Sequence, residues 1–145
     1  MRYNEIIDYL YGLQKFGTKF GLDNITKLCE ISGNPHKSFL SIHIAGTNGK
    51  GSTSAIIESI LRKAGLNTGL FTSPHLVSFT ERIKVNRVEI SEEDVISLTE
   101  EIKEIASELK DFYPTFFEVV TAMAFTYFQR KKIDIAVIEV GMGGR

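Results

Sequence analysis

The fold of this chain is constrained most strongly by one segment, Ser41-Ile42-His43-Ile44-Ala45-Gly46-Thr47-Asn48-Gly49-Lys50-Gly51-Ser52-Thr53. Ile42 and Ile44 alternate before the glycines, as the residues of a strand do. After the glycines, apolar residues recur at helical spacing until Gly65, at Ala55, Ile56, Ile57, Ile60, Leu61 and Ala64. The segment therefore predicts a strand over 40–45, a glycine turn and a helix over about 52–64.

A strand that passes through a glycine turn into a helix can form a polyphosphate site. Backbone N–H groups in the turn and at the helix start point toward an anion, and the helix dipole adds positive potential. Lys50 could reach the outer phosphates, while Ser52 or Thr53 could face Mg²⁺ or a phosphate oxygen. We expect Lys50 to be the catalytic cation. The residues expected to bind the nucleotide are Gly46, Thr47, Asn48, Gly49, Lys50, Gly51, Ser52 and Thr53.

The match to the general phosphate-loop pattern G-x-x-x-x-G-K-[ST] is incomplete. Gly49-Lys50 aligns with it, but the first glycine of the pattern would fall on Ile44. Gly51 stands where a hydroxyl residue is expected, and Ser52 follows one residue late. Taken alone, the segment leaves open a purely structural turn between a strand and a helix.

Composition limits the classes of protein to which the chain can belong. Its 145 residues are enough for one domain with a core, and 43% hydrophobic with 24% charged residues is ordinary for a globular protein. A net charge of −1 gives no electrostatic case for nucleic acid or an anionic membrane. The single cysteine, Cys29, cannot form an internal disulfide. No apolar run reaches the roughly 18 residues of a membrane span, and the first residues do not resemble a signal peptide, so we expect a cytoplasmic protein.

The rest of the chain alternates between helical and strand patterns. Two helices begin with sequences that resemble capping boxes, Ser91-Glu92-Glu93-Asp94 and Thr115-Phe116-Phe117-Glu118. The expected elements are helices over 4–13 and 22–32, a strand over 67–72, a hairpin over 82–90 turning at Asn86-Arg87, helices over 92–109 and 116–131, and a strand over 133–140. This alternation predicts an α/β fold with a parallel sheet and right-handed crossovers.

Polar residues at the ends of two strands could complete the site. In parallel sheets, ligands bind beyond the carboxyl ends of the strands. Glu139 ends the last apolar strand and could hold Mg²⁺, although a strand-end acid can also cap a backbone N–H group. Ser73 and His75 follow the second strand and could contact the metal and a phosphate, or be ordinary loop residues.

The aromatic helix over 116–131 offers a second set of candidates. Most of its aromatic residues are expected to be core. Phe116 and Phe117 lie at the helix start, where a flat ligand ring could stack on them, and Glu118 is first a capping residue and only second a substrate contact.

Taken together, these motifs resemble folylpolyglutamate synthase, which in bacteria often doubles as dihydrofolate synthase. The resemblance covers nearly the whole chain and also accounts for the late serine, because Gly-Thr-Asn-Gly-Lys-Gly-Ser is the form that this family uses. It rests on Ala45 to Ser52, Thr72-Ser73-Pro74-His75-Leu76, Glu81-Arg82-Ile83, Phe117-Glu118 with Thr121 and Ala124-Phe125, and Glu139-Val140-Gly141-Met142-Gly143-Gly144-Arg145.

The resemblance implies a phosphate-loop parallel sheet with flanking helices, as in the ATPase domain of the Mur ligase superfamily. It also implies that ATP activates a folate or dihydropteroate carboxylate as an acyl phosphate, which the amine of L-glutamate then attacks. Ser73 and Glu139 would be magnesium ligands. The substrate site would be bordered by Thr18, Lys19, Phe20, His75, Thr115, Phe116, Phe117 and Glu118.

The resemblance further implies that residues 1–145 are the N-terminal part of an ATP-binding domain, incomplete here, and that a C-terminal glutamate-ligase domain is absent. We expect no ligase activity from the chain alone, an exposed edge on its last strand, and a monomeric parent about three times longer. A Mur-type cell-wall ligase is disfavoured because only about 45 residues precede the glycine turn. A kinase, a GTPase or a nucleotide-binding module without chemistry remains an alternative, although no Asn-Lys-x-Asp guanine-reading segment occurs.

Overall fold

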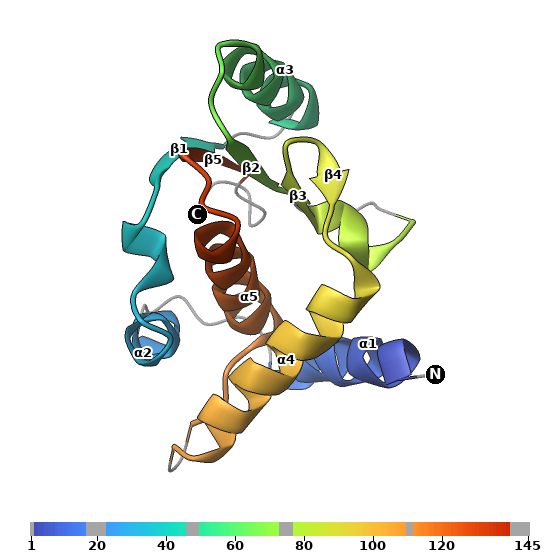
Figure 1. Cartoon of the computed structure of the whole chain (residues 1–145). Helices are drawn as coiled ribbons and strands as arrows, with labels where there is room; N and C mark the ends of the chain where they lie inside the picture. Colours follow the sequence, from blue (N-terminus) through green and yellow to red (C-terminus); the bar gives the residue numbers. More distant parts are fainter. Residues whose placement is uncertain (1, 17–22, 46–49, 73–76, 110–111, 140–145) are drawn as a thin grey trace. The chain divides into compact units, whose positions relative to one another are not determined.

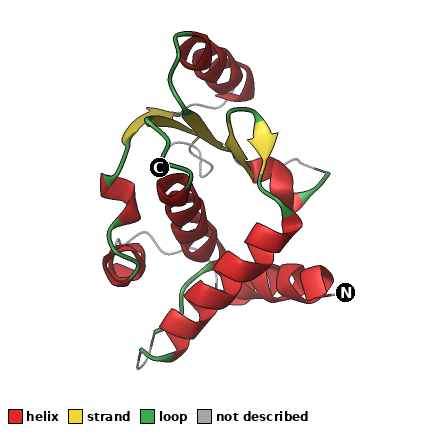
Figure 2. Cartoon of the chain, viewed as in Figure 1, coloured by secondary structure: helices red, strands yellow, loops and turns green. Residues whose placement is uncertain are grey.

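The computed structural model of the chain describes residues 2–16, 23–45, 50–72, 77–109 and 112–139. The chain divides into two compact units, which are described separately. The first unit contains residues 1–36 and 91–127, and the second contains residues 37–90 and 128–145. Figure 2 shows that helices and strands both contribute to the architecture, with the strands gathered in one sheet.

The first unit is helical in its described residues. Its elements are α1 (Arg2–Gly12), the 3₁₀ turn η1 (Leu13–Phe16), α2 (Asp23–Ile31), α4 (Glu92–Ser107) and most of α5 (Phe116–Arg130), and the 3₁₀ turn η2 (Pro35–Lys37) follows α2 at the unit boundary. Apolar side chains that these helices bury include Leu10, Leu28, Val95, Ile102, Val119 and Met123. Cys29 is buried among the core residues.

The second unit is an α/β sheet. Its elements are β1 (Leu40–Ile44), α3 (Lys50–Lys63), β2 (Thr68–Phe71), the 3₁₀ turn η3 (Phe79–Arg82), β3 (Ile83–Val85), β4 (Val88–Glu89) and β5 (Ile135–Glu139). The strand order is β1-β5-β2-β3-β4. Strands β1, β5 and β2 are parallel, and β3 and β4 add an antiparallel hairpin beside β2. Helix α3 packs on the three parallel strands, as Figure 1 shows.

Two details of the sheet differ from the sequence-based predictions. The predicted α/β fold is confirmed, but the sheet is mixed because the predicted hairpin joins it as β3 and β4. The prediction of an exposed edge on the last strand is wrong. β5 lies between β1 and β2 and pairs with both, so the edge strands of the described sheet are β1 and β4.

Glycine is required inside β2 by the packing of the last turn of α5. A Cβ atom on Gly69 would lie 2.7 Å from the Cδ1 atom of Ile133 and 2.8 Å from the Cε1 atom of Phe128. Phe128 is buried and also meets Phe39 edge to face, with 5.7 Å between the ring centroids. The absence of a side chain at residue 69 therefore lets these rings and methyl groups pack directly on the backbone of β2.

The hairpin turns where the sequence predicts it. Asn86 and Arg87 have positive φ angles of 49° and 73°, which is the conformation of a two-residue turn whose twist matches its strands. Among the helices that the structure describes, none is long and apolar enough to cross a membrane.

Candidate functional site

The carboxyl ends of three parallel strands lie at one edge of the sheet in the second unit. Ile44, the last residue of β1, is the register partner of Glu139, the last residue of β5. Phe71, the last residue of β2, is the partner of Ile138. In sheets of this kind the carboxyl edge is where ligands bind, because the loops and helix starts that follow the strands gather there.

Helix α3 starts at this edge with Lys50, shortly after β1 ends. No acidic residue lies in its first turn, and Arg62 and Lys63 lie in its last turn. The positive end of the helix dipole is therefore not neutralised within the helix, which favours an anion at its N-terminus. Ser52 and Thr53 are exposed in the first turns and could offer their hydroxyl groups to such an anion. The predicted binding residues Gly46, Thr47, Asn48 and Gly49 lie outside the described residues.

Glu139 supplies the acidic component of the site. It follows the buried residues Ala136, Val137 and Ile138 and is itself partly exposed at the end of β5. The strand therefore carries a carboxylate out of the apolar core to the edge at which α3 begins. The other predicted metal ligand, Ser73, and the predicted phosphate contact His75 lie outside the described residues. Just before them, the Thr72 N–H group donates to the Arg82 carbonyl at 2.9 Å, which ties the end of β2 to η3.

Thr115 and Glu118 form the predicted capping box in the first unit. The Thr115 N–H group donates to Glu118 Oε1 at 2.8 Å, and the Glu118 N–H group donates to Thr115 Oγ1 at 3.2 Å. Both side chains are buried, so the polar groups of these two residues serve the start of α5. Phe116 stacks on Tyr11 at 5.1 Å, whereas the Phe117 side chain is 52% exposed. Of these four predicted substrate residues, Phe117 has the most exposed side chain. The other predicted substrate residues in this unit, Thr18, Lys19 and Phe20, lie outside the described residues.

Comparison with models of known protein families finds no match. Comparison with individual proteins finds close similarity to one family. The chain is 42% identical to the dihydrofolate synthase/folylpolyglutamate synthase of Bacillus subtilis over 99% of its own length and 34% of that protein. It is 48% identical to the folylpolyglutamate synthase of Thermotoga maritima, whose crystal structure matches 97% of the chain with a TM-score of 0.88. The chain belongs to the folylpolyglutamate synthase/dihydrofolate synthase family.

A further solved structure of this family shows a ligand-bound state. An FPGS–AMPPCP–folate complex is 34% identical over 99% of the chain, with a TM-score of 0.87 and coverage of 36% of that chain. The chain spans about a third of the length of the folylpolyglutamate synthases that it matches. The likeness therefore concerns the sheet and the helices described above.

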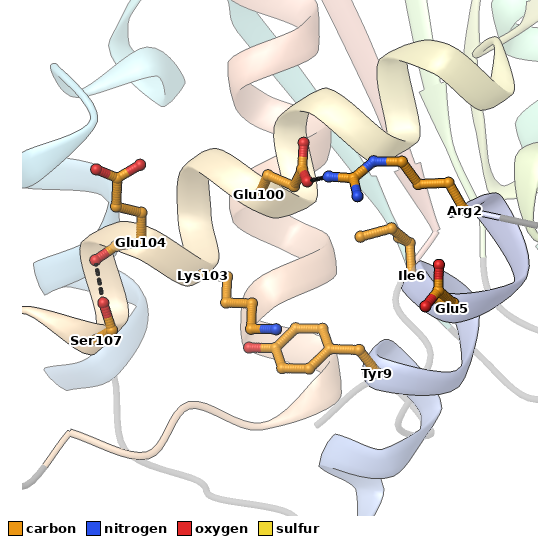
Figure 3. Close-up of a pocket in the computed structure, with 8 residues that line it drawn as sticks. All are labelled: Arg2, Glu5, Ile6, Tyr9, Glu100, Lys103, Glu104 and Ser107. Atoms are coloured by element: carbon orange, nitrogen blue, oxygen red, sulfur yellow. Dashed lines mark hydrogen bonds and ion pairs between the residues drawn. The ribbon is translucent and has the colours of Figure 1, made fainter.

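One groove in the first unit contains none of the residues that the sequence singles out. It has a volume of about 440 Å³ and lies between α1 and α4. Figure 3 shows Arg2 of α1 paired with Glu100 of α4, and the Lys103 Nζ atom lies 4.5 Å from the centre of the Tyr9 ring. Burial raises the pKa of the Tyr9 hydroxyl above its ordinary value. The groove is therefore a polar surface that one ion pair and one contact between a cation and an aromatic ring span from α1 to α4.

Sequence reasoning missed a buried polar cluster around Glu58 of α3. The carboxylate is almost completely buried, and Thr68, Arg62 and Arg87 surround it. Only the spacing of Glu58 and Arg62, four residues apart on one helix, signals part of this cluster in the sequence. The other contacts join residues distant along the chain, which no local pattern reveals.

Within the described residues, no group of three or more His, Cys, Asp or Glu side chains could hold a metal ion.

Proposed function

We propose that the protein carrying this chain is an ATP-dependent ligase that adds L-glutamate to folates, to dihydropteroate, or to both. One observation carries the proposal: a chain that is 48% identical to a folylpolyglutamate synthase brings the start of α3 and Glu139 to the same edge of its sheet. A strand-to-helix turn beside a strand-end carboxylate is the arrangement by which phosphate-loop enzymes hold a nucleoside triphosphate.

The nucleotide would lie at the carboxyl edge of β1, β5 and β2. The relative whose complex contains AMPPCP, an analogue of ATP, supports this assignment. In the proposal, Gly46 to Thr53 bind the phosphates through backbone N–H groups and the hydroxyls of Ser52 and Thr53. Lys50 neutralises charge on the transferred phosphoryl group.

The residues at this edge also fit a magnesium ion. Mg²⁺ prefers oxygen ligands and is held in such sites by one or two protein oxygens together with nucleotide phosphates and water. The Glu139 carboxylate and, in the proposal, the Ser73 hydroxyl supply such oxygens. When bound, the ion would neutralise charge on the phosphates and so favour phosphoryl transfer.

The proposed reaction has two steps. The substrate carboxylate attacks the γ-phosphorus of ATP, an oxygen–phosphorus bond forms, and ADP leaves. The amine of L-glutamate then attacks the acyl carbon and inorganic phosphate leaves; two of the three ammonium protons are released to solvent and the third stays on the amide nitrogen. Lys50 and the N–H groups at the start of α3 stabilise the charge that develops on the phosphoryl oxygens in the first step.

The pterin substrate would lie near the remaining predicted residues. The relative that binds folate together with AMPPCP supports a folate-type substrate. Exposed Phe117 is the described residue best placed to stack on a flat ring, while Thr115 and Glu118 shape the backbone around it through their capping box. Residues 1–145 would form part of the ATP-binding domain. Because the chain spans about a third of its relatives, we expect it to bind nucleotide without ligating glutamate when it is alone.

The test is an assay of ADP release by the full-length protein. ATP and L-glutamate are supplied with dihydropteroate, with a reduced folate, or with neither. The proposal expects ADP release that requires glutamate and at least one pterin substrate, with formation of a glutamyl product. ADP release that ignores both pterin substrates would overturn it.

A further inference from the structure

The buried carboxylate of Glu58 is held by side chains from three elements. Its Oε2 atom accepts a hydrogen bond from Thr68 Oγ1 at 2.6 Å and another from Arg62 Nε at 3.0 Å. Arg87 Nε lies 3.4 Å from Oε1. Glu58 is 1% exposed and Thr68 is fully buried. A carboxylate in such a place is stable only with charged partners and hydrogen bonds, and here it receives both.

The same cluster reaches across the start of β2 to the hairpin. The Thr68 N–H group donates to Asn86 Oδ1 at 2.9 Å, and the Asn86 N–H group donates to the Thr68 carbonyl at 2.8 Å. Asn86 and Arg87 are the two turn residues with positive φ, and this turn contributes both an amide and a guanidinium to the cluster. Helix α3, strand β2 and the hairpin are therefore joined at Thr68.

This junction lies beyond the middle of α3 and at the start of β2, away from the proposed nucleotide site. Lys50 precedes Glu58 by eight residues, which is about 12 Å along a helix. Thr68 precedes Thr72 by four residues, which is about 13 Å along a strand. Because α3 connects two parallel strands, it runs opposite to β2, so the two segments extend from the junction to the same edge.

We propose that Glu58 and Thr68 are positioning residues, which set the angle between α3 and β2 and thereby the distance between Lys50 and the carboxyl end of β2. This inference rests on the proposed function. A tilt of about 5° at the junction would move the start of α3 by about 1 Å, because about 12 Å of helix separates Glu58 from Lys50. A displacement of that size can lower a catalytic rate about 100-fold, because phosphoryl transfer depends on positioning.

A short charge-assisted hydrogen bond suits this task better than apolar contacts do. The 2.6 Å bond between Thr68 and Glu58 has a strict length and direction, whereas apolar surfaces can slide against each other. Arg62 lies one turn beyond Glu58 on the same helix and fixes the carboxylate in the orientation that Thr68 needs. Both hydrogen bonds therefore fix the Oε2 atom of Glu58, while Oε1 has the Arg87 guanidinium at ion-pair distance and no hydrogen bond.

The experiment compares two isosteric substitutions in the full-length protein. Thr68→Val removes the bond to Glu58 and keeps the volume of the side chain. Thr80→Val is the matched control, because Thr80 Oγ1 donates to Glu89 Oε1 at the same 2.6 Å and contacts neither residue of the junction through that bond. Thr68→Ser restores the hydroxyl. Steady-state constants are measured for ATP, glutamate and the pterin substrate, at a temperature where thermal melts show each variant folded.

The expected result is a KM for ATP raised about 10-fold or a kcat lowered about 10-fold in Thr68→Val, with the KM values of the pterin and glutamate within 2-fold of wild type. Thr68→Ser and Thr80→Val should stay within 2-fold of wild type throughout. Equal losses of melting temperature in the two valine variants, with no change in the ATP constants, would overturn the inference. If Thr68→Val does not fold, Arg62→Met replaces it as the test variant, because the Arg62 side chain is partly exposed. Unchanged kinetic constants for ATP in Arg62→Met contradict the positioning role, and a 2- to 5-fold change in them supports it.

Failure of the inference is distinguishable from failure of the proposed function. Amide NMR shifts of Ser52, Thr53 and Thr72 report on the start of α3 and the end of β2 without substrate or turnover. If wild type releases no pterin-dependent ADP, the proposed function fails even where Thr68→Val shifts these amides. If wild type is active and the amides of Thr68→Val match those of wild type, the positioning role alone is contradicted.

Discussion

Substituting Gly69 tests how tightly the last turn of α5 packs on β2. An alanine Cβ would lie 2.7 Å from Ile133 Cδ1 and 2.8 Å from Phe128 Cε1, whereas carbon atoms in contact ordinarily lie about 3.5–4.0 Å apart. Either side chain would have to move by about 0.7 Å or more, and Phe128 is fully buried. Overpacking of this kind costs about 1–3 kcal/mol, offset by about 0.5–1 kcal/mol because alanine restricts the unfolded chain. We therefore expect Gly69→Ala to lower the free energy of unfolding by about 1–2 kcal/mol.

Urea unfolding of the chain provides the measurement, and Gly12→Ala provides the control. Gly12 ends α1 without a positive φ, and no atom lies within 4 Å of the position that an alanine Cβ would take there. Alanine at residue 12 should therefore stabilise by a few tenths to about 1 kcal/mol. Ile133→Val removes the methyl group that meets residue 69 and alone costs about 0.5–1.5 kcal/mol. On the Gly69→Ala background it should cost less, since it relieves the clash. A stabilising Gly69→Ala, or strictly additive effects in the double variant, would refute the packing argument.

Three further predictions concern the first unit. Glu118→Ala leaves the Thr115 N–H group without its 2.8 Å acceptor and should lower the free energy of unfolding by about 1–2 kcal/mol in urea, while Glu93→Ala on the exposed face of α4 should change it by less than about 0.5 kcal/mol. Phe117→Ala should leave stability within about 0.5 kcal/mol but raise the KM of the pterin substrate in the full-length protein; an unchanged KM would remove Phe117 from the substrate site. Burial raises the pKa of the Cys29 thiol, so its contribution to stability is complete below the ordinary thiol pKa of about 8.5 and is lost as pH rises through the raised value. The urea midpoint should therefore fall less at alkaline pH in Cys29→Ala than in wild type, and equal falls would contradict the burial argument.

Local features of the fold could be predicted from the sequence because local chemistry determines them. Strand β1 ends at Ile44 and α3 begins at Lys50, where the alternation of apolar residues changes to helical spacing. The turn at Asn86-Arg87 has the predicted location, and the capping box of Thr115 and Glu118 makes both expected hydrogen bonds. Gly65, with a φ of 96°, ends α3 as the sequence indicates.

The first residue of the last strand could not be predicted from the local sequence pattern. Residues 133–140 are apolar enough to predict a strand, but the described strand begins at Ile135. Lys132 adopts a φ of 56°, and the Ile133 N–H group donates to the Phe128 carbonyl, which closes the end of α5. Ile133 therefore belongs to the helix cap, and its apolar side chain packs against Gly69.

Strand order and the Glu58 cluster could not be predicted because they depend on contacts between distant residues. Nothing in the apolar run of β5 indicates that it pairs with both β1 and β2. In the sequence, Glu58 similarly resembles a surface residue of an amphipathic helix. Only the fold of the sheet places Thr68 and Arg87 beside it. The candidate site was partly accessible to sequence reasoning, since Lys50 and Glu139 were expected at one edge from the rule for parallel sheets.

The nucleotide site can be located directly by NMR of the chain with AMPPCP and Mn²⁺ as a paramagnetic substitute for Mg²⁺. If the nucleotide and its metal lie between α3 and β5, the amide signals of Ser52, Thr53 and Glu139 broaden in proportion to bound Mn²⁺ and sharpen again when excess Mg²⁺ displaces it. Saturable broadening at the acidic groove residues Glu100 and Glu104, with the other three amides unchanged, would contradict the account, as would the absence of saturable broadening.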